Sequence, residues 1–169
     1  MPDVLLLGGR GQIGSGLRTY LPNLDREYRF TSIDLPGAPD RAPSADRTQF
    51  IELDISESPD RLSELMQGYD LVVYLARKGP LAAMNALTDL VFESLLAQNP
   101  VPLMVASSSV HSCDGVYDVH EGIWSVWAER RFNDLNPRPE RILSSIPAHP
   151  TNDYGEEKAY VERWCQKLG

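Results

Sequence analysis

The start of the sequence constrains the fold more than any other part of it. The apolar run "DVLLL" (3–7) is typical of a strand that is buried on both faces of a sheet. Gly8, Gly11 and Gly14 follow at three-residue spacing, and a segment with helical spacing (11–21) begins among them. Glycine permits a tight turn and close approach of the backbone to a ligand. This order predicts a nucleotide phosphate site at the helix N-terminus; the alternative is a turn with a structural role only.

Strands and helices alternate along the next part of the chain. In one predicted helix Ser58 is the expected N-cap, Pro59 takes the first helical position and Gly68 marks the end. The other apolar and helical patterns predict strands at 28–34, 49–53, 70–76 and 101–107 and a further helix at 81–98. Such alternation predicts a doubly wound α/β fold with a parallel sheet of about five strands and helices on both faces.

Length and periodicity bear on the domain organisation. The 169 residues favour one domain, 1–169, over two. The stretch 108–150 has no clear periodicity. Because long loops in compact domains are usually functional, we expect this stretch to form an active-site or lid segment.

Charge and composition exclude some partners. The net charge of −8 argues against a nucleic-acid-binding face, since phosphate binding depends on clustered Lys and Arg. The apolar runs are too short for a membrane span and the N-terminus lacks a basic signal-peptide start, so we expect a cytoplasmic protein without a membrane partner. The two cysteines and three histidines are scattered, which predicts neither a disulfide framework nor a metal site.

Asp34 lies at the end of the second predicted strand, twenty residues after Gly14. A carboxylate at this point of a dinucleotide-binding fold accepts hydrogen bonds from the ribose hydroxyls of NAD and repels the 2′-phosphate of NADP. The position therefore favours NAD. Two alternatives stay open: Arg41 and Arg47 lie nearby and can bind such a phosphate, and Asp34 can instead cap a loop.

Further short motifs occur in a fixed order: "LDIS" at 53–56, "YLA" at 74–76, "ASSS" at 106–109 and "YGEEK" at 154–158. Together with the glycine turn and Asp34, they resemble the extended short-chain dehydrogenase/reductase family. Within it the chain is most similar to the NAD-dependent epimerase/dehydratase branch, with uronate and hexose-phosphate dehydrogenases among the members it resembles. The resemblance implies a Rossmann-like fold and NAD as the cofactor.

The resemblance also implies roles for individual residues. Asp54 and Ile55 are expected to border the adenine, and Leu75 and Ala76 to pass beside the cofactor. Ser108 is the expected active-site serine, with Ser107 and Ser109 as alternatives. The glycine turn that is expected to hold the cofactor phosphates comprises Gly8, Gly11, Gln12, Ile13 and Gly14.

Tyr154 and Lys158 form a Tyr-x-x-x-Lys pair. The capping-box spacing of Asp153 and Glu156 predicts a helix that starts at Asp153, and residues four apart lie on one face of it. A nearby ammonium favours the phenolate, so Tyr154 is the expected general base, with Ser108 donating to the substrate oxygen. Lys158 is also expected to reach the nicotinamide ribose. The alternative is a surface tyrosine and a solvated lysine.

The segment before this pair is longer than the family usually has. Its aromatic and basic residues form either a lid that grips an anionic sugar, or a short helix at about 123–133 with an aromatic inner side and solvated arginines. The residues concerned are Trp124, Trp127, Arg130, Arg131, Phe132, Arg138 and Arg141.

Family members continue beyond the Tyr/Lys helix into a smaller region that holds the substrate, and this region is expected to be missing here. The last helix, 153–168, has two apolar stripes and in this family commonly pairs across a dimer, so we expect a homodimer through it. Three hypotheses follow. The chain is an NAD-dependent oxidoreductase or epimerase of a sugar or sugar derivative; or it is an NAD(H)-binding sensor, or a truncated member that a partner chain completes; or it is another nucleotide-binding domain.

Overall fold

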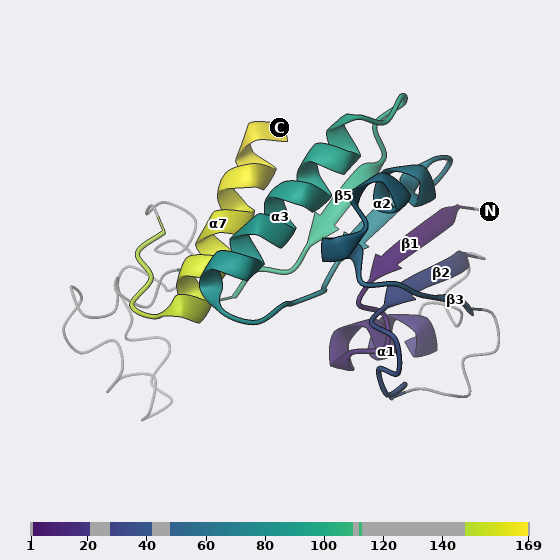
Figure 1. Cartoon of the computed structure of the whole chain (residues 1–169), viewed down its shortest axis with the longest axis horizontal. Coiled ribbons are helices and arrows are strands. Elements are labelled where there is room, and N and C mark those ends of the chain that lie inside the picture. Colours follow the sequence, from purple (N-terminus) through teal and green to yellow (C-terminus); the bar gives the residue numbers. More distant parts are fainter. Residues whose placement is uncertain (1, 21–27, 42–47, 110–111, 113–147, 169) are drawn as a thin grey trace, which may run out of the picture. The chain divides into compact units, whose positions relative to one another are not determined.

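The computed structural model of the chain describes residues 2–20, 28–41, 48–109, 112 and 148–168. These residues belong to two compact units, Met1–Ser107 and Ser108–Gly169. Figure 1 shows the helices and strands along the chain. The predicted helix at 123–133, with its aromatic and arginine residues, lies outside the described residues, as does Arg47. The organisation of 1–169 as a single domain stays a prediction.

The first unit is built on a parallel sheet with strand order β3-β2-β1-β4-β5. Each strand forms where the sequence predicted one, within two residues at either end. The bounds are β1 (Asp3–Leu7), β2 (Arg29–Asp34), β3 (Thr48–Glu52), β4 (Leu71–Tyr74) and β5 (Leu103–Ala106). The predicted doubly wound α/β fold is therefore confirmed.

The strands are connected by helices α1 (Gln12–Tyr20), α2 (Pro59–Met66) and α3 (Leu81–Leu96), with a short 3-10 helix, η2 (Ile55–Glu57), before α2. Right-handed crossovers in this strand order place α1 on one face of the sheet and α2 and α3 on the other, where they pack together (Figure 1). Ser58 occupies the N-cap position of α2 as predicted, although its side chain makes no capping hydrogen bond.

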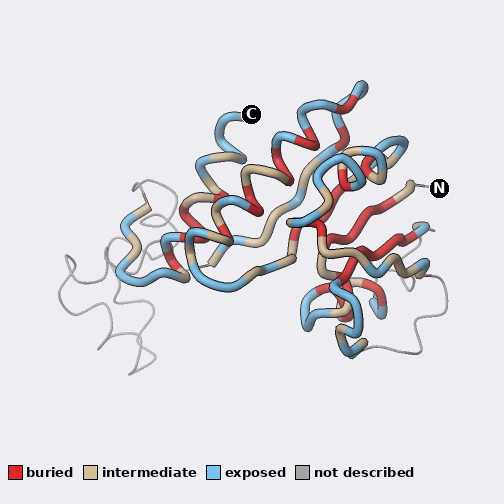
Figure 2. Tube along the Cα trace, in the orientation of Figure 1, coloured by how far each residue is buried: buried red, intermediate tan, exposed pale blue. Residues whose placement is uncertain are grey.

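The core of the first unit follows the central strands. Val4 to Leu7 of β1 are at most 1 % exposed, and Figure 2 shows this stretch as buried along its length. Leu62 and Met66 of α2, together with Phe92 of α3, are fully buried. An apolar strand covered on both faces is what the unbroken run at 3–7 predicted.

The connections leave β1 in two directions, and this positions the site. β1 leads through α1 to β2 on one side, while β4 pairs with β1 on the other side. The strand order therefore reverses between β1 and β4. Open α/β sheets bind ligands beyond the carboxyl ends of the strands at such a reversal.

The second unit contains α7 (Asp153–Leu168), the helix predicted from the capping-box spacing. Its start at Asp153 is confirmed, but the predicted capping residue is wrong. The Asn152 side-chain oxygen accepts the Gly155 backbone N–H at 2.9 Å, so Asn152 is the N-cap. Both residue types cap helices well, and the choice depends on where helical backbone angles begin.

No helix in the described part of the chain has both the length and the apolar character needed to cross a membrane.

Candidate functional site

A cavity of about 280 Å³ lies at the carboxyl ends of β1 to β4 in the first unit. Residues directly after β1, at the end of β2, and after β3 and β4 line it. Among them are Gly8, Arg10, Gly11, Asp34, Leu35, Ala38, Arg41, Asp54, Ile55, Leu75, Ala76, Arg77 and Lys78. The cavity thus occupies the crevice where this class of sheet binds ligands.

The charges around the cavity favour an anionic ligand. Four basic side chains line it, Arg10, Arg41, Arg77 and Lys78, against two acidic ones, Asp34 and Asp54. The whole chain has a net charge of −8, so this balance is the reverse of the average. A concentration of cations in a cleft attracts phosphate-bearing ligands.

The glycine turn has the geometry that glycine alone permits. Gly8 has φ of +91°, and a Cβ on it would stand 2.9 Å from the backbone nitrogen of Ala76. A Cβ on Gly14 would stand 2.4 Å from the Cα of Gly9, because α1 packs closely against the turn at this point. The turn is held by the hydrogen bond from Gly8 N–H to the Ile33 carbonyl, at 2.9 Å. A side chain at either position would force the backbone apart.

Gln12 and Ile13 open α1, and their side chains are exposed, Ile13 at 59 %. The first N–H groups of a helix have no partner inside it and carry the positive end of the helix dipole. The first turn of α1 contains no acidic residue. If these two predicted residues bind the cofactor, the backbone N–H groups are therefore the atoms suited to it.

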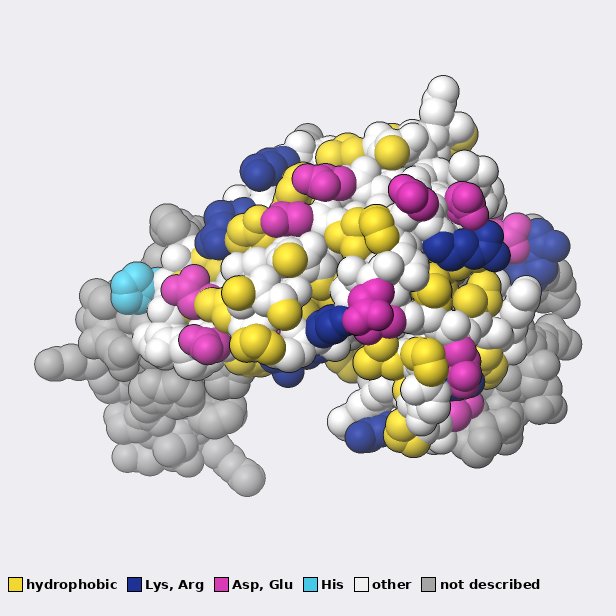
Figure 3. Space-filling model, viewed as in Figure 1, with side chains coloured by type: hydrophobic (Ala, Val, Ile, Leu, Met, Phe, Trp, Pro, Cys, Tyr) yellow, Lys and Arg dark blue, Asp and Glu magenta, His cyan; other side chains and the backbone are white. Residues whose placement is uncertain are grey.

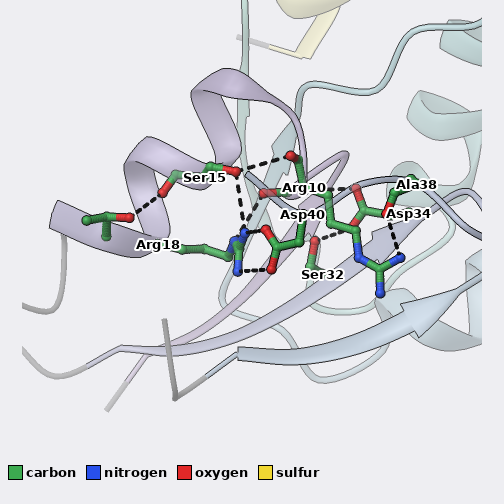
Figure 4. Close-up of polar contacts among 9 residues, drawn as sticks. Arg10, Ser15, Arg18, Ser32, Asp34, Ala38 and Asp40 are labelled. Carbon is green, nitrogen blue, oxygen red and sulfur yellow. Dashed lines mark hydrogen bonds and ion pairs between the residues drawn. The ribbon is translucent and has the colours of Figure 1, made fainter. Parts of the chain in front are cut away.

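Asp34 is 7 % exposed and its carboxylate is held from two sides, as Figure 4 shows. Oδ1 accepts the backbone N–H of Arg10 at 2.9 Å, and Oδ2 accepts the Ser32 hydroxyl at 2.6 Å. A carboxylate has about four acceptor positions, so two remain within the described part of the chain. Two free acceptors on one rigid carboxylate suit the two adjacent hydroxyls of a ribose.

Arg10 ties the turn to the loop that follows β2. Its guanidinium donates to the Ala38 carbonyl at 3.1 Å and to Glu52 at 2.8 Å. The hydrogen bond from Arg10 lowers the pKa of the Glu52 carboxyl. The position of Arg10 beside Asp34 is thereby fixed.

Arg18 of α1 contacts the same loop, through Asp40. Its side chain is 0 % exposed, donates to the Gly9 carbonyl at 3.1 Å and forms an ion pair with Asp40 (Figure 4). Its guanidinium also lies 4.7 Å from the centre of the Phe50 ring, within the range of a cation–π contact. Arg10 and Arg18 therefore hold the loop from Leu35 to Arg41 in place where it borders the cavity.

Asp54 follows β3 and is paired with Lys78, which follows β4. Lys78 Nζ lies 2.8 Å from Asp54 Oδ2, and this hydrogen bond, with that of Ser56, lowers the pKa of Asp54. Figure 3 shows other basic side chains next to acidic ones on the face in view.

In the second unit, Tyr154 and Lys158 lie on one face of α7, as their spacing predicted. Lys158 Nζ stands 5.6 Å from the centre of the Tyr154 ring. The same ammonium forms an ion pair with Glu157 at 3.1 Å. The cation is therefore close to the phenol but shared with a carboxylate.

Ser108, the predicted active-site serine, donates its hydroxyl to Glu162 of α7. The Ser112 hydroxyl donates to the same Glu162 oxygen at 2.9 Å. A serine hydroxyl has one proton, so in this arrangement Ser108 offers a ligand its acceptor lone pairs only. Ser108, Lys158 and Tyr154 all lie in the second unit, and Glu162 joins them one turn after Lys158.

Sequence reasoning missed four of these residues: Arg10, Arg18, Lys78 and Glu162. Three had a usable signal. Arg10 stands inside the glycine turn, Lys78 follows "YLA" by two residues, and Glu162 is four residues after Lys158 on the same helix. Arg18 had none, because its partner Asp40 lies in an irregular loop.

Comparison with known proteins gives the family. The model of the NAD dependent epimerase/dehydratase family matches residues 4–169. The chain belongs to this family. The family predicted from the motif order is therefore confirmed, and its NAD dependence agrees with the predicted cofactor.

Solved structures show the same fold. UDP-glucose 4-epimerase from Thermotoga maritima, with UDP-glucose, is 18 % identical with a TM-score of 0.66. dTDP-glucose 4,6-dehydratase from Bacillus anthracis, in complex with NAD, is 16 % identical with a TM-score of 0.68. Uronate dehydrogenase from Agrobacterium tumefaciens is 17 % identical with a TM-score of 0.60. No curated protein sequence matches the chain significantly.

The alignments with these structures cover 98–99 % of this chain but only 50–56 % of theirs. The chain thus spans about half the length of the solved structures that it matches. The similarity establishes the Rossmann-like fold of this chain.

Proposed function

We propose that the chain binds NAD in the cavity of the first unit and acts in an NAD-dependent oxidoreductase or epimerase of a sugar or sugar derivative. One observation carries the proposal: the cavity at the strand ends joins a glycine turn, a rigid acidic residue at the end of β2 and an excess of cations. Family membership supports it. Similar structures hold NAD or UDP-glucose, which supports a sugar-type substrate.

In this proposal the cofactor, when bound, supplies hydride transfer, and the chain's residues hold it in place. The N–H groups at the start of α1, including those of Gln12 and Ile13, bind the pyrophosphate, and Gly8, Gly11 and Gly14 let it approach. Asp34 accepts the two ribose hydroxyls, which favours NAD over NADP. Leu75 and Ala76 border the cofactor along the end of β4.

The proton chemistry is assigned to the second unit. Tyr154 removes the proton of a sugar hydroxyl, or returns it, as a general base and acid. Lys158, whose Nζ stands 5.6 Å from the centre of the Tyr154 ring, contacts the nicotinamide ribose. Ser108 contacts the substrate oxygen, for which its proton must turn away from Glu162.

A second candidate function is an NAD(H)-binding module without turnover, or a chain that a partner completes. Two observations favour it. The Ser108 proton is engaged by Glu162, and the Lys158 ammonium is paired with Glu157.

Calorimetry with NAD and NADP tests the shared part of both candidates, and absorbance at 340 nm across a panel of sugars and sugar nucleotides separates them. Binding of NAD with turnover supports the enzyme; saturable binding without an absorbance change supports the module. No NAD binding would remove both.

The Tyr154→Phe variant tests the assigned chemistry. It is expected to abolish turnover while leaving NAD affinity unchanged, since only the phenolic hydroxyl is lost. Tyr160→Phe on the same helix is the matched control and is expected to keep its activity. Turnover that survives in Tyr154→Phe contradicts the assignment.

The proposal also includes a cytoplasmic homodimer that forms through the 153–168 helix. Tyr160 and Trp164 lie four residues apart on this helix and supply its second apolar stripe. Cell fractionation tests the location.

A further inference from the structure

Glu162 of α7 receives two serine hydroxyls at one carboxylate oxygen. Its Oε1 accepts the hydroxyl of Ser108 and, at 2.9 Å, that of Ser112. Ser108 is exposed, whereas Ser112 is only 2 % exposed. All three residues belong to the second unit. One of the two donors is thus accessible to a ligand, and the other is shielded from solvent.

The Ser112 hydroxyl has two acceptors in reach of its single proton. Its Oγ lies 2.9 Å from Glu162 Oε1 and also 2.9 Å from the carbonyl oxygen of Ser109. A serine hydroxyl donates one hydrogen bond at a time, and its O–H rotates freely. Because the two distances are equal, rotation of the O–H exchanges one acceptor for the other without movement of heavier atoms.

The exchange leaves each of these acceptors with a donor. The Ser109 carbonyl also accepts the backbone N–H of Ser112, at 3.1 Å, so it stays paired when the Ser112 hydroxyl turns to Glu162. Glu162 in turn keeps a serine donor when the proton of Ser108 turns away from it. A half-buried carboxylate oxygen that loses its donor is destabilised, so the second serine lowers the free energy needed to turn Ser108.

We propose that Ser112 is a positioning residue: when its proton turns to Glu162, the proton of Ser108 is released to the substrate oxygen. This inference rests on the proposed function, in which Ser108 contacts that oxygen. Each hydroxyl keeps its own hydrogen, so no bond is made or broken in the exchange. The alternatives are that Ser112 stays on the Ser109 carbonyl and supports the fold only, or that both serines donate to Glu162 permanently.

Urea unfolding without any ligand tests the exchange itself. It compares the wild type with Ser108→Ala, Ser112→Ala and the double variant. In each single variant the remaining hydroxyl is expected to bond to Glu162, so only a neutral hydrogen bond is lost. The double variant also loses the hydrogen bond to the charged oxygen. It should therefore lower the folding equilibrium constant about fivefold more than the product of the two single effects.

Kinetics test the release of Ser108. We measure kcat/KM with NAD and the compound of the sugar panel that the wild type converts best, and calorimetry gives the affinity for NAD. Ser112→Ala is expected to lower kcat/KM about tenfold, because Glu162 then has the Ser108 proton as its remaining serine donor. The affinity for NAD should not change. Ser112→Thr returns the hydroxyl and should recover most of the lost activity.

Glu162→Ala separates positioning from packing. Without the carboxylate the proton of Ser108 has lost its acceptor on α7, so adding Ser112→Ala should then cost less than about twofold in kcat/KM. A serine that only supports the fold would cost the same in both backgrounds. Ser94→Ala is the matched control, because Ser94 is another buried serine, on α3 and outside the described lining of the cavity. This variant should behave as the wild type.

Two results overturn the inference. If the effects of Ser108→Ala and Ser112→Ala on stability simply multiply, the two hydroxyls do not replace each other at Glu162. If Ser112→Ala costs the same kcat/KM with and without Glu162, Ser112 does not act through that carboxylate. A wild type that converts no compound of the panel refutes the proposed enzyme, and with it the release to a substrate, while the unfolding experiment still decides whether the donors exchange.

Discussion

Asp40→Asn removes the charge that balances the most deeply buried cation of the first unit while keeping the shape of the side chain. Arg18 is 0 % exposed at its side chain, and Asp40 is 21 % exposed. In the variant the Arg18 guanidinium keeps its hydrogen bond to the Gly9 carbonyl and its contact with Phe50, but it loses its counter-charge. The perturbation therefore removes the charge of the ion pair.

The expected loss of unfolding free energy is about 2–3 kcal/mol. Breaking a fully buried pair by removing one partner costs ~3–5 kcal/mol. The value here is lower because Asp40 is partly solvated and because asparagine retains one acceptor oxygen for Arg18. The loop from Leu35 to Arg41 borders the cavity, so NAD affinity is expected to fall as well.

Urea unfolding followed by circular dichroism measures the stability, and calorimetry measures the affinity for NAD. Asp3→Asn is the matched control, because Asp3 pairs with Arg29, whose side chain is 66 % exposed. Exposed pairs contribute ~0–1 kcal/mol, so this variant should stay near the wild type. The reasoning is refuted if Asp40→Asn loses no more stability than Asp3→Asn.

Three further predictions concern the turn, the pH dependence and the oligomer. Gly8→Ala should lower the free energy of unfolding, measured in urea, by clearly more than Gly37→Ala. Both residues have positive φ, but of the two only Gly8 has backbone within 3 Å of an added Cβ. Equal losses in the two variants would contradict this prediction. Since the Lys78 hydrogen bond lowers the Asp54 pKa, its stabilisation is complete above the unfolded pKa of about 3.9 and is lost as pH falls through the folded pKa. The stability gap between wild type and Asp54→Asn should thus be constant above about pH 5 and shrink in more acidic urea titrations; a gap that widens refutes this. Sedimentation at micromolar concentration should show a dimer that Trp164→Glu dissociates; a monomeric wild type rules out the predicted interface.

The elements of the first unit could be predicted because each is encoded locally. An unbroken apolar run such as 3–7 has few structures open to it, and the glycines after it restrict the turn further. The predicted helix at 11–21 forms as Gln12–Tyr20, and the predicted strand at 70–76 as Leu71–Tyr74. The predicted and observed ends differ because the terminal residues of a helix or strand make fewer of its backbone hydrogen bonds.

The supports of the site could not be predicted, because they join residues that are distant in sequence. Arg18 and Asp40 are 22 positions apart, and Lys78 and Asp54 are 24 apart. No local pattern distinguishes such a pair from two solvated charges. The Glu162 contact with Ser108 spans 54 positions and depends on the path of the chain before α7.

Arg10, Arg18 and Lys78 of the first unit divide into two kinds, and their positions predict different phenotypes. Arg18 is completely buried and is absent from the described lining of the cavity, so its ion pair serves the loop and its loss should appear first in stability. Arg10 and Lys78 line the cavity and also bind a neighbouring loop, so each connects ligand affinity to loop position. The Lys78–Asp54 pair is more solvated than the Arg18–Asp40 pair. Replacing Lys78 should therefore cost more in ligand affinity than in stability.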